Sequence, residues 1–164
     1  MKNEKIQSKR SYCTSEEKRM VFGNKPVGNS MEPIYIEIDW SGKNYCAAPV
    51  DERIALIATG KTIEEIEDRM AEGLEFHFEG MELHGDPIPE EYRNGWEPVF
   101  VLSASAMIKY SDQFLNRRAL ADVTGINQHQ LSHYVSGLKK ARPATRERIA
   151  EGLRTIVARL SFLL

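Results

Sequence analysis

The sequence predicts an α+β protein, in which a small βββαβ sheet-plus-helix domain precedes an all-α helix-turn-helix domain. Apolar residues alternate with polar ones in the first half, recur at helical spacing in the second half, and the two halves carry opposite charge. Hydrophobic residues make up 41% of the 164 positions, which is typical of a globular chain. We divide the chain into a flexible leader (1–30), an acidic domain (31–103) and a basic domain (104–164).

The net charge of −2 hides a strong segregation of charge along the chain. Residues 1–30 contain seven Lys or Arg and three Asp or Glu, residues 31–103 contain five and 17, and residues 104–164 contain ten and four. The three segments therefore carry +4, −12 and +6. This pattern indicates a basic domain suited to a phosphate backbone and an acidic domain suited to a basic protein. Ordinary variation of surface charge is the alternative.

The first 30 residues lack a sustained apolar period and end in a stretch rich in Gly and Asn, so we expect a flexible leader. Met31 is a second candidate for the working start, because the first strand pattern begins three residues after it. No apolar run approaches the roughly 20 residues of a membrane span, and no signal-peptide segment follows Met1. We therefore expect a soluble, cytoplasmic protein with no membrane partner.

Three short segments of the acidic domain have strand patterns. Residues 34–40 alternate Ile34, Ile36, Ile38 and Trp40 with Tyr35, Glu37 and Asp39, which is the period of a half-buried strand. Residues 45–50 follow a turn and form the returning strand, and residues 54–59 form a third strand that Gly60 ends. A three-strand meander is the expected result.

A helix is predicted after this meander. Thr62 and Glu65 have the spacing of a capping box, and the apolar residues Ile63, Ile66, Met70 and Leu74 then share one helical face. We expect the helix to reach about Glu79. A break containing Gly and Pro follows at 85–89, and the apolar run 98–102 returns to the sheet, which completes the βββαβ order.

Helical patterns dominate from Ser105 onward, and we expect helices at 110–115, 116–124, 128–138 and 145–163. Residues 118–138 fit a helix-turn-helix: Ala121 is small where two helices approach, Gly125 allows the positive φ of the turn, and Asn127 is a good N-cap. The residues that anchor the second helix are Ile126, Leu131, and Val135 or Tyr134. A plain helical hairpin explains these features equally well, but it does not explain the charge of +6.

The second helix of this motif carries the candidate DNA-binding side chains. Polar residues that can hydrogen-bond base edges face outward, and basic residues follow where phosphates would lie. The candidate contacts are Asn127, Gln128, His129, Ser132, His133, Ser136, Lys139, Lys140 and Arg142. Gln128 is the strongest candidate for base readout, because its amide can pair bidentately with adenine. Residues 110–155, with the Arg142-Pro143 step into the last helix, resemble the lambda-repressor-like helix-turn-helix family, which implies operator binding as a dimer.

The last helix has a narrow apolar seam with spacings of 4, 3, 4 and 3. Its members are Ile149, Leu153, Ile156, Leu160 and Leu163. The seam either packs within the monomer or joins two copies. A motif that reads two half-sites about one DNA turn apart favours a two-fold dimer.

The acidic domain resembles the HicB antitoxin family over about residues 33–103. The resemblance rests on the strands 34–40 and 45–50, on Gly60-x-Thr62-x-Glu64-Glu65 at the start of the helix, and on Gly85-x-Pro87-Ile88-Pro89. It implies a degenerate RNase H-like fold and a small basic HicA-like toxin as partner, an RNase that is silenced when the antitoxin covers its active site. The family's Pro-Asp-Leu-Pro-Gly-like turn is replaced here by Pro49-Val50-Asp51-Glu52-Arg53.

These features predict a type II antitoxin that neutralises a HicA-like toxin through residues 31–103 and represses its own operon through residues 104–164. The expected partners are the toxin, double-stranded operator DNA, and further copies of the chain in a homodimer or higher homo-oligomer. The alternative is a stand-alone transcriptional repressor whose acidic domain oligomerises or senses a ligand.

No catalytic residue, cofactor or metal site is predicted, so we do not expect an enzyme. Asp39 is the only strand acid placed like a first ligand of a two-metal nuclease site, which needs four converging carboxylates. His129 and His133 have the i, i+4 spacing of metal ligands, but contact with the DNA groove is the favoured interpretation. Cys13 and Cys46 are too few for a disulfide framework or a structural zinc site.

Overall fold

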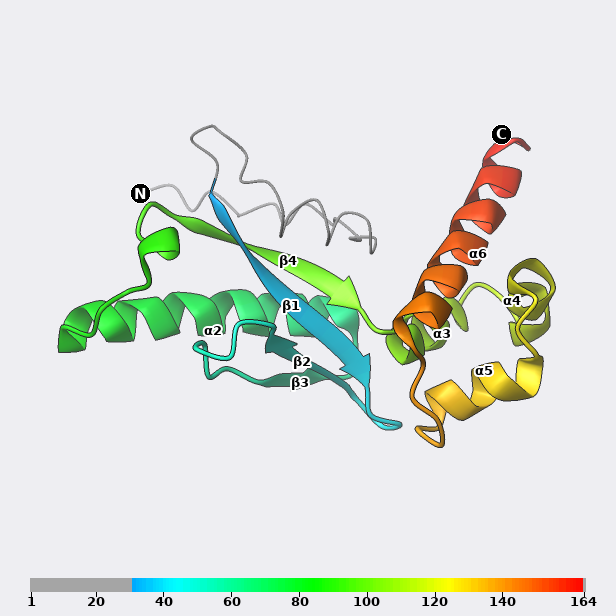
Figure 1. Cartoon of the computed structure of the whole chain (residues 1–164), viewed down its shortest axis with the longest axis horizontal. Helices are drawn as coiled ribbons and strands as arrows, with labels where there is room; N and C mark the ends of the chain where they lie inside the picture. Colours follow the sequence, from blue (N-terminus) through cyan, green and yellow to red (C-terminus); the bar gives the residue numbers. More distant parts are fainter. Residues whose placement is uncertain (1–30, 164) are drawn as a thin grey trace.

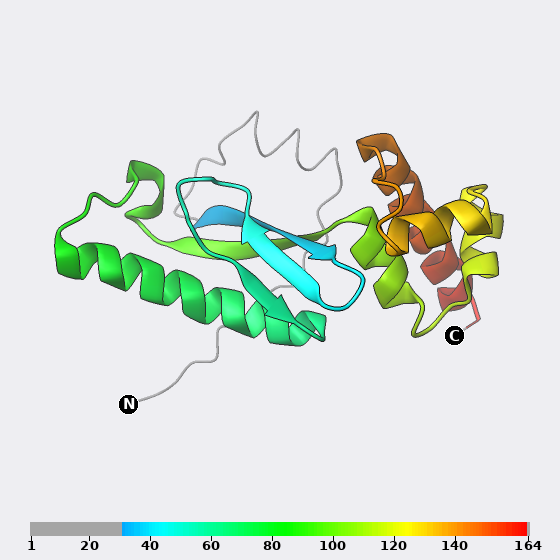
Figure 2. The same cartoon turned by 90° about the horizontal axis from the view of Figure 1, so that it is seen from below.

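The computed structural model describes residues 31–163 (Figure 1). The flexible leader expected at 1–30, Cys13 and the final Leu164 lie outside these described residues. The described chain is a mixed α+β structure with a four-strand sheet and five α-helices. Figure 2 shows the first of these helices along one face of the sheet and the other four gathered at one end of it.

The strands are β1 (Glu32–Trp40), β2 (Tyr45–Pro49), β3 (Ala58–Gly60) and β4 (Trp96–Leu102), in the sheet order β3-β2-β1-β4. Strand β1 pairs antiparallel with β2 and parallel with β4, so Ile38 lies between Ala47 and Leu102. The alternation expected in residues 34–40 is confirmed, because Ile34, Ile36 and Ile38 are completely or almost completely buried. They form the central row of the core.

Helix α2 (Ile63–His84) covers this row. The Thr62 hydroxyl accepts from the Glu65 backbone N–H at 3.2 Å, so the predicted N-cap is confirmed. The Glu65 carboxylate accepts from the N–H of Lys61, one residue before the cap, at 2.8 Å. The helix runs five residues beyond the expected end at Glu79. Phe78 extends the buried face, and the chain turns only at Gly85, whose φ of 73° is left-handed.

The third strand differs most from its prediction, because residues 54–57 are not in the sheet and only Ala58–Gly60 pair with β2. Side-chain contacts fix this segment instead. Leu56 packs against α2 so closely that a Cβ added at Gly73 would lie 2.9 Å from the Leu56 Cδ1 atom. The glycine therefore makes room for Leu56 beside the helix.

Four helices follow the sheet: α3 (Ala104–Ser111), α4 (Arg117–Thr124), α5 (Gln128–Val135) and α6 (Pro143–Ser161). The helix expected at 110–115 is wrong. Helix α3 starts earlier because the Ser103 hydroxyl caps it, accepting from the Ala106 N–H at 3.1 Å, and because Ile108 anchors it in the core. The other three helices are confirmed, although α5 ends three residues before the expected Leu138, just ahead of Gly137 with φ 75°.

The helical part (103–163) has its own core, and direct contacts join it to the sheet part (31–102). Trp40 and Met107 pack against both cores. The Arg146 guanidinium in α6 donates to the Leu102 carbonyl at the end of β4 at 2.8 Å. The helical part therefore packs against one end of the sheet, as Figure 1 shows.

Candidate nucleic-acid interface

The two short helices α4 and α5 are joined by a three-residue turn that local hydrogen bonds define. Gly125 ends α4 in the left-handed region, with φ 62° and ψ 18°. The Asn127 side chain then caps α5 by accepting from the His129 N–H at 2.8 Å, and Asn116 caps α4 by accepting from the Ala119 N–H at the same distance. Both conformations expected at the turn, those of Gly125 and Asn127, are present.

Helix α5 is held by its inner face. Ile126, Leu131, Tyr134 and Val135 are buried in one cluster with Leu120 of α4 and Ile149 of α6. All the residues proposed to anchor the second helix therefore do so. This burial fixes which side of α5 faces outward.

The outward side divides the candidate contacts into two groups. Asn127, Gln128 and His129 are exposed at the start of α5, and the side chains of Gln128 and His129 make no hydrogen bond within residues 31–163. Ser132 and His133 are half-buried. The Ser132 hydroxyl donates to the Gln128 carbonyl at 3.0 Å, and the exposed Ser136 donates to the His133 carbonyl at 3.2 Å. Gln128 and His129 are therefore the best placed to bind a ligand, whereas the Asn127 side chain already caps α5.

The basic residues lie in the loop between α5 and α6. Lys139, Lys140 and Arg142 are all exposed. The Lys139 N–H donates to the His133 carbonyl at 3.2 Å, which folds the loop back on the end of α5. Lys140 lies near enough to Asp39 for its charge to help lower the pKa of that carboxyl. Lys140 acts on a carboxylate of the sheet part. Lys139 and Arg142 are therefore the better candidates for contact with an external partner.

Arg117, at the start of α4, is a structural partner of α5 that sequence reasoning missed. Its Nε and Nη2 atoms donate to the Asp112 carboxylate at 3.1 and 2.8 Å, and its Nη1 donates to the Ser132 hydroxyl at 2.9 Å. The three residues thereby tie the chain before α4 to the outward side of α5. The sequence carried no signal, because Asp112 and Arg117 are five residues apart and lie in different elements.

Helix α6 holds α4 in place through a close approach. The Arg148 guanidinium donates to the Thr124 carbonyl at 2.6 Å. A Cβ added at Gly152 would lie 2.4 Å from the Thr124 Cγ2 atom and 3.3 Å from the Val123 Cγ2 atom. Gly152 is therefore required for the two helices to touch.

The seam expected for dimerisation separates into an inner and an outer section. Ile149 is completely buried in the helical core, so it packs within the chain and does not face a second copy, which corrects its assignment. Leu153 and Ile156 are partly buried against the same core. Leu160 is 53% exposed and Leu163 is 76% exposed, near the end of α6 that rises away from the other helices in Figure 1. These two residues remain accessible.

Asp39 lies where the sheet part meets the helical part. One carboxylate oxygen accepts from the hydroxyls of Ser103, at 2.5 Å, and Ser105, and from the Trp40 N–H at 2.8 Å. Burial raises the pKa of Asp39, but these hydrogen bonds outweigh burial and lower it below the usual range. Asp39 is therefore an ionised hydrogen-bond acceptor that joins the end of β1 to the start of α3. Among residues 31–163, no three Asp, Glu, His or Cys side chains are grouped to hold a metal.

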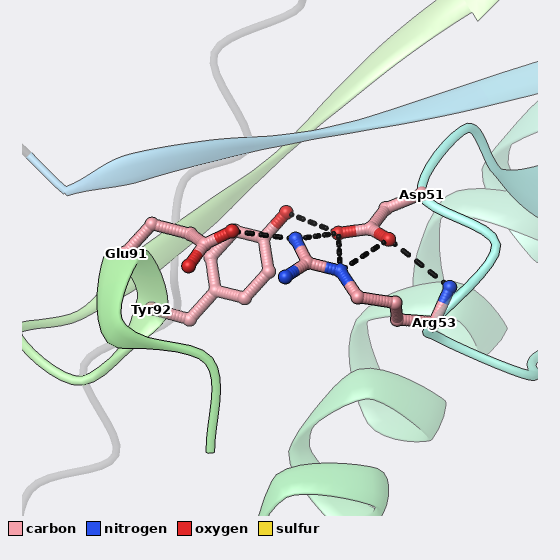
Figure 3. Close-up of polar contacts among 4 residues, drawn as sticks. All are labelled: Asp51, Arg53, Glu91 and Tyr92. Carbon is pink, nitrogen blue, oxygen red and sulfur yellow. Dashed lines mark hydrogen bonds and ion pairs between the residues drawn. The ribbon is translucent and has the colours of Figure 1, made fainter.

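A second polar cluster links the loop after β2 to the short helix η1 (Glu90–Tyr92), as Figure 3 shows. Arg53 forms ion pairs with Asp51 at 2.7 Å and with Glu91 at 2.5 Å, and the Tyr92 hydroxyl donates to Asp51 at 2.9 Å. The hydrogen bonds from Arg53 lower the pKa of Asp51 to about 2, while burial and the bond to Asp51 raise the pKa of Tyr92 to about 12. The positive charge of Arg53 is paired with the carboxylates of Asp51 and Glu91, so the cluster stabilises the loop after β2.

The chain matches no protein-family model, no curated protein and no solved structure. Across residues 31–163, none of the helices has the length and apolar character needed to span a membrane.

Proposed function

We propose that this chain is a DNA-binding repressor that also neutralises a basic toxin, with operator recognition by the helical part and toxin binding by the sheet part. The observation that carries the proposal is the exposed start of α5. The side chains of Gln128 and His129 project there and make no hydrogen bond within the described chain, on a helix whose other side is buried. Side chains in this position read base edges in helix-turn-helix proteins.

Charge supports the DNA-binding role. Residues 104–164 carry a net charge of +6, although the whole chain carries −2. Exposed Lys139 and Arg142 lie in the loop after α5, where they can contact phosphates. Gln128 would supply sequence preference, and the two cations would supply affinity.

The toxin-binding role is supported by the element order and charge of the sheet part. The order β1-β2-β3-α2-β4 is the βββαβ order that the resemblance to HicB antitoxins implies. Residues 31–103 carry −12, which suits a small basic partner such as a HicA-like RNase. We propose two domains on this basis, with the junction near Ser103.

The test is co-purification with the product of the adjacent reading frame. A tagged copy of that protein is expressed with this chain untagged, and complex stoichiometry and growth are measured. A stoichiometric complex that relieves growth arrest would support the antitoxin role. Operator binding without such a complex would instead indicate a stand-alone repressor whose sheet part has another role, and loss of both would overturn the proposal.

A further inference from the structure

Gly80 is a half-buried glycine inside α2, and no side chain packs over its Cβ position within the described residues. A glycine inside a helix destabilises it relative to alanine. Gly73 has a packing reason, since Leu56 occupies the space beside it. A Cβ added at Gly80 would meet no atom within 4 Å, and its backbone is not in the left-handed region. The Gly80 carbonyl lies 2.8 Å from His84 Nδ1, but the space at its Cβ position is open.

Two large apolar side chains border this space. Phe76 lies one helical turn before Gly80 and is 79% exposed, and Leu83 lies one turn after it and is 84% exposed. Residues at such spacings share one side of a helix, so Gly80 leaves a gap on this side between two exposed apolar side chains. We call Phe76, Gly80 and Leu83 the α2 notch.

The rim of the α2 notch is acidic. Glu72 lies four residues before Phe76, and Glu79 lies between Phe76 and Leu83 at helical spacing, and both are exposed. Arg69 is the only Lys or Arg in α2, and its guanidinium is directed to the Thr59 carbonyl. Two exposed apolar side chains with a gap between them and carboxylates beside them fit a partner that presents an apolar side chain between cations.

We propose that the α2 notch is the docking site of a basic partner protein, which inserts one large apolar side chain over Gly80 and places Lys or Arg beside Glu72 and Glu79. This inference rests on the proposed toxin-binding function and locates its surface. A second copy of the chain is a poorer occupant, because a two-fold contact through this face would bring the two acidic rims together.

The experiment measures binding of the purified adjacent-frame product to the full chain by titration calorimetry. Gly80→Gln places a side chain between Phe76 and Leu83, and Phe76→Ser removes one of the two apolar side chains. Phe114→Ser is the matched control, because Phe114 is similarly exposed at 71% but lies in the helical part. We expect both notch variants to bind at least about tenfold more weakly, and the control to stay within about twofold. Gly80→Gln should raise Tm by about 2 °C, which shows that lost binding is not lost folding.

Each outcome separates the two proposals. If the wild-type chain binds and both notch variants bind equally well, the docking site is wrong but toxin binding stands. If Phe114→Ser weakens binding as much as Phe76→Ser, the effect is unspecific and the site is likewise overturned. A wild-type chain that forms no complex overturns both proposals. Variants that abolish self-association, while leaving binding to the basic protein intact, would assign the notch to a second copy instead.

Discussion

At the scale of single residues, the local hydrogen bonds decide which polar side chains of α5 can bind a ligand. Ser132 and Ser136 donate to backbone carbonyls, and Ser132 also accepts from Arg117. Gln128 and His129 lack such partners within residues 31–163. The first turn of α5 is thus the part available for the proposed contact with DNA, whereas the later serines are engaged within the chain.

Replacing Gln128 by alanine should therefore lower operator affinity by about 1 to 3 kcal/mol and relax sequence preference, because a bidentate contact to a base is lost. Lys139→Ala should weaken binding to operator and scrambled DNA alike and reduce the salt dependence, because it removes a phosphate contact. Fluorescence anisotropy on both duplexes at several salt concentrations measures the difference. Equal losses of Gln128→Ala on the two duplexes would remove Gln128 from base readout.

The cluster around Asp51 should make stability depend on pH at the acidic end. Hydrogen bonds from Arg53 lower the pKa of Asp51 to about 2 from an ordinary 3.8. The carboxylate therefore stabilises the fold above pH 4, and this contribution disappears as the pH falls from about 4 to about 2. We expect the Asp51 carboxylate to contribute about 1 kcal/mol to the free energy of unfolding. This is less than the full pKa shift implies, because the Arg53 side chain is 58% exposed and water screens the ion pair.

Urea denaturation of the wild-type chain and Asp51→Asn, at pH 6 and in steps down to pH 2, tests this contribution. The variant should be less stable at pH 6 and should approach the wild type near pH 2. A stability difference that does not change with pH would show that Asp51 acts through its shape and neutral hydrogen bonds alone.

At the scale of helices, the same substitution should have opposite effects at two glycines. Gly152→Ala places a Cβ 2.4 Å from Thr124 Cγ2, so α4 and α6 must separate, and overpacking of this kind costs about 1 to 3 kcal/mol. Gly80→Ala meets nothing within 4 Å and should stabilise α2 by about 0.5 to 1 kcal/mol. Chemical denaturation of the two variants measures both changes in the free energy of unfolding. A stabilising Gly152→Ala would mean that the two helices adjust at no cost.

Elements with local signals were predictable from the sequence, whereas elements fixed by distant residues were not. Asn116 and Asn127 cap α4 and α5 through neighbouring N–H groups, and Gly125 ends α4, so these bounds follow from short patterns. The third strand was placed too early because Leu56 turns to α2 instead of pairing with β2. Among the candidate DNA contacts, Ser132 accepts a hydrogen bond from Arg117, which lies in another helix. Residue spacing along the chain does not predict a contact between two helices.

At the scale of the whole molecule, contacts at one end of the sheet relate the two proposed activities. Asp39 at the end of β1 accepts from Ser103 and Ser105, and Arg146 donates to the last carbonyl of β4. The helical part is thereby placed against the end of the sheet, while the α2 notch lies on the outward side of α2. Toxin and operator would occupy different surfaces of one chain.

The proposed dimer belongs to this scale, because the outer section of the α6 seam is the part of that seam left exposed. Leu160→Ser combined with Leu163→Ser should convert a dimer into a folded monomer, since both side chains are exposed and removing them leaves the helical core intact. Affinity for an operator with two half-sites should then fall towards that for a single half-site, because one chain contacts one half-site. Sedimentation velocity measures the oligomeric state, and anisotropy on whole and half operators measures the DNA effect.

Ile149→Ala supplies the contrast, because Ile149 is buried within the chain and its truncation should lower stability by about 2 to 5 kcal/mol without selectively dissociating the dimer. Leu83→Ser, an equally drastic change at an exposed leucine in α2, should leave sedimentation unchanged. If the double α6 variant sediments like the wild type, another face joins the copies. The exposed leucines of α6 would then need a different explanation, and the inner seam would remain a feature of the monomer core.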